Sequence, residues 1–81
     1  MTLVDLPRDI DATVHSVEAH DAHDAIARRL RELGFVAGER VRVTAFGPFT
    51  RDPLVVRVGT SAFALRRTEA ARIRVSTDEM P

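Results

Sequence analysis

The sequence predicts a mostly β domain, a small barrel of five or six short antiparallel strands with one inserted α-helix. Three observations lead to this expectation. Several short runs alternate apolar and polar residues, as half-buried strands do. One longer run carries apolar residues at helical spacing. The chain has only 81 residues, so a single domain with one small core is expected.

The first elements are a lead-in and a strand, followed by the helix. Residues 1–11 form the lead-in, and residues 12–19 form the first strand. The helix is expected over residues 21–33, where apolar side chains recur at positions i, i+4 and i+7. These side chains are Ile26, Leu30 and Leu33. We expect Asp21 to cap the start of the helix and Gly34 to end it in the left-handed conformation.

Strands and turns alternate in the rest of the chain. Further strands are expected over residues 39–46, 54–58, 61–66 and 73–75. Gly38 supplies the turn before the first of these strands. The glycine and prolines of residues 47–53 indicate a loop, in which Asp52 and Pro53 form a turn. Gly59 opens a two-residue type II′ hairpin connection.

A short helical turn is expected near residues 68–71, with Thr68 as its cap. The core of the domain is then expected over about residues 12–75, and residues 76–81 form a flexible tail. Closure into a barrel protects the edge strands of a small antiparallel sheet, so we expect an SH3-like barrel. An open ferredoxin-like sheet is the alternative, but it would need a second long helix.

Composition excludes several classes of function. The chain has no cysteine, which rules out disulfides and thiolate metal sites. Its 12 basic and 12 acidic residues balance, which argues against a broad nucleic-acid-binding surface. No glycine-rich phosphate loop or nucleophile elbow is present, so a catalytic role is not expected. Without an apolar span or a signal peptide, a cytoplasmic protein is expected.

Four motifs together carry a family resemblance. They are Arg29-Leu30-x-x-Leu33-Gly34-Phe35-x-x-Gly38, Asp52-Pro53-Leu54, Ala64-Leu65-Arg66-Arg67-x-Glu69-Ala70 and Ile73-x-Val75. In this order and spacing the chain resembles the FeoA family of bacterial ferrous iron uptake. The resemblance implies an SH3-like barrel and a cytoplasmic accessory role. It also implies protein–protein contact with the membrane GTPase permease that carries ferrous iron, so that the chain meets the membrane only through that partner.

Six residues are candidates for contact with such a partner. They are Phe35, Val36, Phe49, Arg51, Arg66 and Arg67. Each also has a structural interpretation. Leu33, Gly34 and Gly38 would serve as helix stop and turn around the core side chain of Phe35, and Arg66 and Arg67 would form surface ion pairs with Glu69.

One cluster of residues has the chemistry of a metal site. His20, His23 and Asp24 lie close in sequence, with His15 upstream, and imidazole and carboxylate groups suit zinc or ferrous iron. The spacing matches no established ligand pattern, and a solvated helix start is the alternative interpretation. Any divalent ion there would be weakly bound, and no cofactor is expected to be required.

Three functions therefore compete. The first is a protein-binding accessory of the ferrous iron permease, and the second is a small protein that binds or senses a divalent metal. The third is a small barrel that binds nucleic acid through Arg28, Arg29, Arg31, Arg40 and Arg42. The sequence leaves the oligomeric state open, including a homodimer.

Overall fold

The computed structural model describes residues 1–77, apart from the side chain of Phe49. In chain order the elements are η1 (Leu3–Asp5, a 3₁₀-helix), β1 (Asp11–Val17), α1 (Ala25–Leu33), β2 (Arg40–Phe49), β3 (Asp52–Val58), β4 (Ser61–Leu65), α2 (Arg67–Ala70) and β5 (Ile73–Thr77). All strand pairings are antiparallel. No helix of the described chain is long and apolar enough to cross a lipid bilayer.

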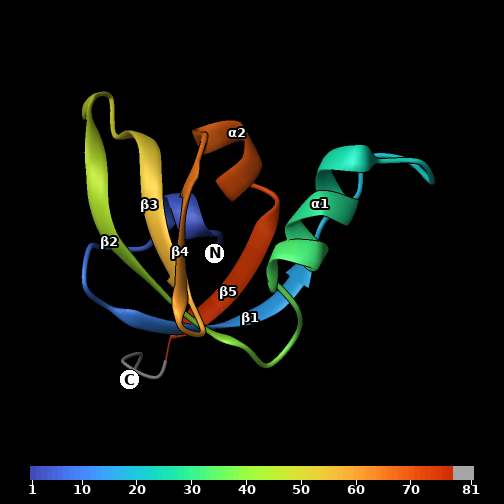
Figure 1. Cartoon of the computed structure of the whole chain (residues 1–81), viewed down its shortest axis with the longest axis horizontal. Helices are drawn as coiled ribbons and strands as arrows, with labels where there is room; N and C mark the ends of the chain where they lie inside the picture. The colour runs from blue at the N-terminus through green and yellow to red at the C-terminus, as the bar shows by residue number, and fades with distance from the viewer. Residues whose placement is uncertain (78–81) are drawn as a thin grey trace.

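The five strands form one curled sheet in the order β4-β3-β2-β1-β5. Figure 1 shows the sheet bending round so that β4 faces β5, with α2 between them at one end and α1 projecting from the side. The mostly β fold with an inserted helix is thus confirmed. No strand pairing joins β4 to β5 within residues 1–77, and side chains of both strands, Leu65 of β4 and Ile73 and Val75 of β5, belong to the common core.

The N-terminal segment belongs to the core. Leu3 and Leu6 are completely buried, although a core beginning near residue 12 was expected. The segment also forms an antiparallel bridge from Thr2 to Arg74, and the amide of Val75 donates to the carbonyl of Met1 at 3.0 Å. It therefore covers the outer edge of β5, which leaves β4 as the sheet edge without a strand beside it in the described part of the chain.

The region from 47 to 53 is not the loop that its glycine and prolines predict. β2 and β3 extend through it and meet at a two-residue turn, Thr50-Arg51, whose φ angles of 52° and 60° are those of a type I′ hairpin. A bulge between Phe46 and Phe49 absorbs the irregular residues. The glycine and prolines therefore fit inside a hairpin, because a bulge leaves one residue outside the hydrogen-bonded ladder.

The second hairpin agrees with its prediction. Gly59 adopts a φ of 59° between β3 and β4, while Thr60 keeps a negative φ, as a type II′ turn requires. The short helix α2 begins at Arg67, and Thr68 is not its cap. Instead the carboxylate of Asp52 accepts a hydrogen bond from the amide of Arg67 at 3.2 Å.

The C-terminal strand is longer than predicted. Ser76 and Thr77, which were assigned to a flexible tail, pair with Thr13 and Ala12 of β1. The remaining residues of that predicted tail, 78–81, lie outside the described residues.

Candidate functional site

The junction after α1 is built by the Leu33-Gly34-Phe35 segment as predicted. Gly34 has a φ of 116°, and its amide donates to the carbonyl of Arg31 at 3.0 Å. The amide of Phe35 donates to the carbonyl of Leu30 at 3.1 Å, which completes a Schellman motif. This geometry turns the Phe35 ring into the core, where its centroid lies 6.3 Å from that of Phe63.

Burial separates the two candidate contact residues at this junction. Phe35 is 0% exposed, so it has no surface to offer a partner, whereas Val36 is 43% exposed. Val36 lines a shallow hollow of about 330 Å³ with Val17, His15 and Arg31. A hollow thus lies between α1 and β1 beside Val36, whereas the Phe35 ring expected at the edge of a groove is a core residue. Ile26, predicted on the buried helix stripe, is 41% exposed because Ala27 and Leu30 take the core face.

The tip of the β2–β3 hairpin carries the next candidate, Arg51. Its guanidinium lies 4.8 Å from the centroid of the Phe46 ring, in a cation–π contact. Arg51 therefore folds back onto its own hairpin while remaining exposed. The side chain of Phe49, another predicted contact, is not among those the structure describes.

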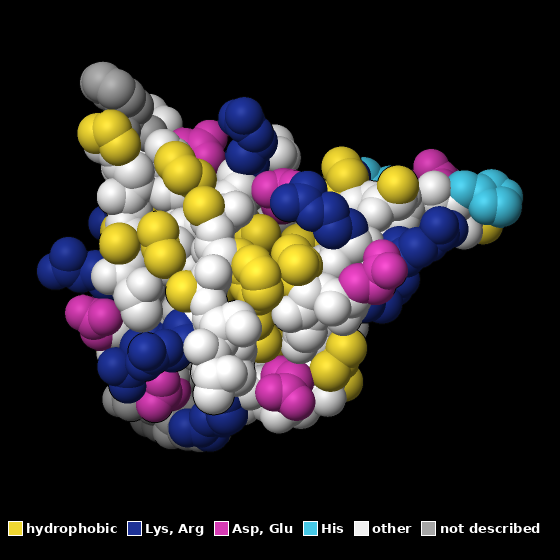
Figure 2. Space-filling view, in the orientation of Figure 1, with side chains coloured by type: hydrophobic (Ala, Val, Ile, Leu, Met, Phe, Trp, Pro, Cys, Tyr) yellow, Lys and Arg dark blue, Asp and Glu magenta, His cyan; other side chains and the backbone are white. Residues whose placement is uncertain are grey.

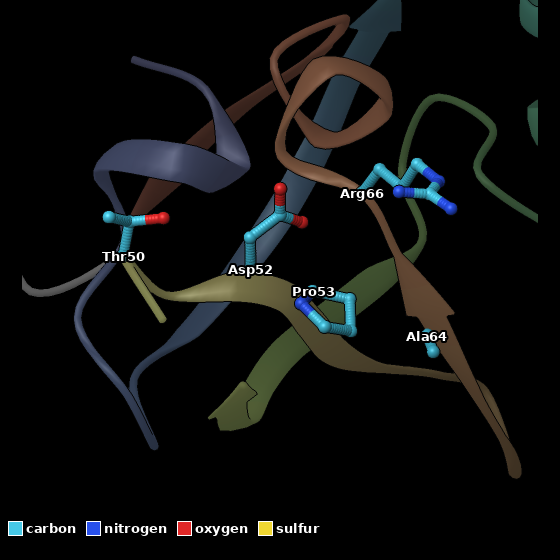
Figure 3. Close-up of a pocket in the computed structure, with 5 residues that line it drawn as sticks. All are labelled: Thr50, Asp52, Pro53, Ala64 and Arg66. Atoms are coloured by element: carbon cyan, nitrogen blue, oxygen red, sulfur yellow. The ribbon is translucent and has the colours of Figure 1, made fainter. Parts of the chain in front are cut away.

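The predicted ion pairs of Arg66 and Arg67 with Glu69 do not form. The carboxylate of Glu69 instead accepts from the backbone amide of Arg66 at 2.9 Å and lies 3.5 Å from the guanidinium of Arg29. Arg66 extends away from the sheet beside a hollow of about 470 Å³, as Figure 3 shows, and the ring of Pro53 lies between Asp52 and Ala64. Arg66 is thus an exposed cation with no acidic partner in the described part of the chain.

In the predicted metal cluster, the aspartate carboxylate serves as the cap of a helix. Asp24, and not Asp21, is the N-cap of α1: its carboxylate accepts from the amides of Ile26 and Ala27 at 3.0 and 3.1 Å, and from that of His20 at 2.8 Å. Arg72 forms an ion pair with the same carboxylate, whose side chain is only 7% exposed. No lone pair of Asp24 is left facing solvent with the geometry of a metal ligand.

The histidines of the cluster are exposed and do not converge with other ligands. His15 lies on β1, while His20 and His23 lie in the segment before α1, where the amide of His23 donates to Asp21 at 2.8 Å. Within residues 1–77 no group of three or more histidine, aspartate or glutamate side chains is placed to hold a metal ion.

The Asp24 cap makes a testable prediction about pH. Hydrogen bonds from the amides of His20 and Ala27, assisted by Arg72, hold the pKa of the Asp24 carboxyl far below its ordinary value of 3.8. A lowered folded-state pKa means that the carboxylate stabilises the fold above pH ~4 and that this contribution is lost as the pH falls towards the folded-state pKa. Asp24→Asn should lower Tm by roughly 5–10 °C at pH 7.

Calorimetry across pH 2 to 7 measures this effect. The Tm difference between wild type and Asp24→Asn should be greatest at neutral pH and shrink below pH ~4. Asp21→Asn is the matched control, because the exposed Asp21 only holds a local turn, and its Tm should change by less than about 2 °C. A constant difference between wild type and Asp24→Asn at every pH would contradict the proposed role of the charge.

Among the charged residues on the outer face of the sheet, Arg42 was expected only in the nucleic-acid-binding alternative, and Asp11 and Arg57 were not site candidates. Arg42 of β2 lies directly opposite Asp11 of β1 and Arg57 of β3. The Nε atom of Arg42 is 2.8 Å from the Asp11 carboxylate, and this hydrogen bond lowers the pKa of Asp11 and raises that of Arg42. Arg57 has no such partner within residues 1–77. Only the pairing of three strands brings these residues together, although each occupies a polar position of an alternating strand.

Three hollows lie on the surface of the described chain. They have volumes of about 330 to 540 Å³ and are shallow and open to solvent. One holds the Arg42 and Arg57 side chains, and no buried polar side-chain atom of the described chain lacks a hydrogen-bond partner. Each of these three hollows is open to water, so none of them would shield a reacting group.

Comparison with known proteins identifies close relatives of this chain. A family model for the FeoA domain matches residues 1–77. The crystal structure of FeoA from Stenotrophomonas maltophilia with zinc is 56% identical, with a TM-score of 0.86 over 94% of this chain and 89% of that one. That protein is described as a prokaryotic SH3 domain protein and a candidate activating factor of ferrous iron transport.

Two solution structures are also similar. FeoA from Chlorobium tepidum is 36% identical, with a TM-score of 0.82 over 96% of this chain and 70% of that one. Iron(II) transport protein A from Clostridium thermocellum is 28% identical, with a TM-score of 0.84, and this chain spans 46% of its length. No curated protein matches the chain.

Proposed function

Because this chain belongs to the FeoA family of ferrous iron transport accessory proteins, we propose that it acts by direct contact with the cytoplasmic GTPase part of a membrane ferrous iron permease. The observation that carries the proposal is the family match over residues 1–77, together with a 56% identical relative described as a candidate transport-activating factor. In this proposal the chain is a cytoplasmic, non-enzymatic protein.

The surface chemistry supports contact and not catalysis. Its hollows are shallow, and its exposed side chains include both apolar residues and arginines. A nucleic-acid-binding role has less support, because several of the arginines form ion pairs with acidic residues of the same chain. Arg29 lies within 3.5 Å of Glu69, and Arg40 and Arg42 both lie within 4 Å of Asp11.

A resident metal has little support from the residues present. Zinc accompanies the Stenotrophomonas relative, but here Asp24 is engaged as a helix cap and His15, His20 and His23 are exposed without a third converging ligand in the described chain. The donor set does not fit a closed zinc or iron site. The proposal therefore assigns the contact with the permease to protein side chains.

An NMR titration tests the proposal. The isotope-labelled chain is titrated with the soluble GTPase domain of the permease from the same organism, and an unrelated GTPase domain of similar size is the control. We expect saturable shifts with a Kd at or below about 100 µM, because weak accessory contacts still register in that range. The absence of shifts at that concentration, or equal shifts with both domains, would overturn the proposal.

A further inference from the structure

The outer face of strands β2, β3 and β4 has an unusual composition. Cross-strand pairing sets Ala45, Val55 and Ala64 in one row across the three strands. The exposed side chains of Ala62 and Pro53 flank this row on β4 and β3. A solvent-facing side of an antiparallel sheet normally carries polar residues, so this apolar row requires an explanation. Figure 2 shows hydrophobic side chains gathered over this part of the molecule.

Two arginines without acidic partners border the apolar row. Arg57 pairs across the strands with Ala62 on one side and with Arg42 on the other. Two like charges opposite each other destabilise a sheet, and of Arg42 and Arg57 it is Arg42 that forms an ion pair with Asp11. At the other end, Arg66 follows β4 and its side chain has no ion-pair partner within residues 1–77. The structure thus keeps two uncompensated cations at opposite ends of an apolar strip.

The spacing of these cations defines what could bind. Arg57 lies in the same row as Ala62, and Arg66 lies four residues beyond Ala62, which corresponds to about 13 Å along the strand. Carboxylates four residues apart in an extended segment span the same distance and point to the same side. Because Ala62 and Ala64 are short, a second backbone can approach β4 closely, and β4 is also the sheet edge without a neighbour in the described chain.

From this geometry we propose that the outer face of β2–β3–β4 binds an extended segment of another protein that has an apolar centre and an acidic residue at each end. Its carboxylates pair with Arg57 and Arg66, and its apolar side chains cover Ala45, Val55 and Ala64. The inference extends the proposed function and rests on it only for the identity of the protein that carries the segment.

Other occupants fit the face less well. A nucleic acid strand would need aromatic side chains for base stacking and a continuous basic track, whereas the row here is Ala-Val-Ala. A second copy of this chain would have to supply free carboxylates from near the same face. Three of the acidic groups there are already engaged, since Asp11 binds Arg42, Asp52 accepts from the amide of Arg67, and Glu69 accepts from the amide of Arg66.

The chemistry of the surface can be tested with a synthetic probe. The probe is a short peptide with a Val-Leu-Val centre and a glutamate at each end, and its counterpart carries lysine in place of glutamate. In an NMR titration we expect the acidic peptide to shift the amides of Val55, Ala62 and Ala64 with a Kd of roughly 0.1–1 mM, and the lysine peptide to leave them unchanged. No shift with the acidic peptide, or equal shifts with both peptides, would overturn the inference.

Charge reversal tests the two arginines. Arg57→Glu and Arg66→Glu should each weaken binding of the acidic peptide about tenfold or more. Arg28→Glu is the matched control, because Arg28 is exposed on α1 away from this face and has no ion pair in the described chain. Thermal unfolding of every variant verifies that it is folded. Binding by the Arg57 and Arg66 variants that equals that of Arg28→Glu would exclude the surface.

The same variants separate this inference from the proposed function. If the wild-type chain binds the GTPase domain and Arg57→Glu and Arg66→Glu bind it equally well, the docking face is wrong while the proposed function stands. If the acidic peptide binds at this face and the GTPase domain does not bind anywhere, the proposed function fails and the chemistry of the face is upheld.

Discussion

Gly47→Ala should cost about 3 kcal/mol or more in the free energy of unfolding. A methyl group placed on Gly47 would overlap the carbonyl oxygen of Asp52 and lie 2.7 Å from Cδ of Pro53. Both neighbours belong to the backbone or ring of the adjacent strand, so neither can rotate away. A domain of this size has a total stability of about 4–12 kcal/mol, and the loss should be plain in the midpoint of urea unfolding.

Gly59→Ala is the informative comparison for Gly47→Ala. Gly59 has a φ of 59°, which strains any other residue, but no atom lies within 4 Å of where its Cβ would stand. The free energy of unfolding of Gly59→Ala should therefore fall by only about 1 kcal/mol. If Gly47→Ala were no more destabilising than Gly59→Ala, the close approach of β2 and β3 at the bulge would be disproved.

Phe35→Ala should destabilise the domain by about 3–5 kcal/mol. The ring is completely buried, and it contacts the Phe63 ring between α1 and the sheet. Truncation would leave a cavity where the residue after the end of α1 packs into the core. Urea unfolding monitored by circular dichroism measures the loss.

The adjacent residue supplies the control for Phe35. Val36 is 43% exposed, and Val36→Ala should change the free energy of unfolding by less than about 1 kcal/mol. Equal losses for the two variants would show that the Schellman turn does not direct Phe35 inwards. A near-neutral Phe35→Ala would return Phe35 to the list of candidate partner contacts.

Local signals in the chain sufficed for several elements. Gly34 and Phe35 end α1 as predicted, because the left-handed residue and the apolar residue after it form a motif within six consecutive positions. Gly59 likewise indicates its hairpin without help from distant residues. Alternation of apolar and polar residues was enough to predict the fold class, since burial of one sheet face imposes that period on each strand.

The choice of Asp24 over Asp21 as the cap could not be made from local signals. Both aspartates precede the helix and both have suitable chemistry. Arg72, which lies 48 residues further along the chain, forms an ion pair with Asp24 and not with Asp21. Residue type alone makes Asp24 a candidate metal ligand, and the number of hydrogen bonds that its carboxylate accepts in the fold weakens that prediction.

The candidate docking face likewise depends partly on local sequence and partly on the tertiary structure. The sequence predicts a small β-barrel because strand periodicity, glycine turns and helix stops act over a few neighbouring residues, and the order of its four motifs carries the resemblance to the FeoA family. Only the three-dimensional arrangement shows which arginines lie beside the apolar row without an acidic partner in the described chain. Strand register and the bulges in β2 determine which side chains of distant segments become neighbours, and register depends on packing across the whole sheet.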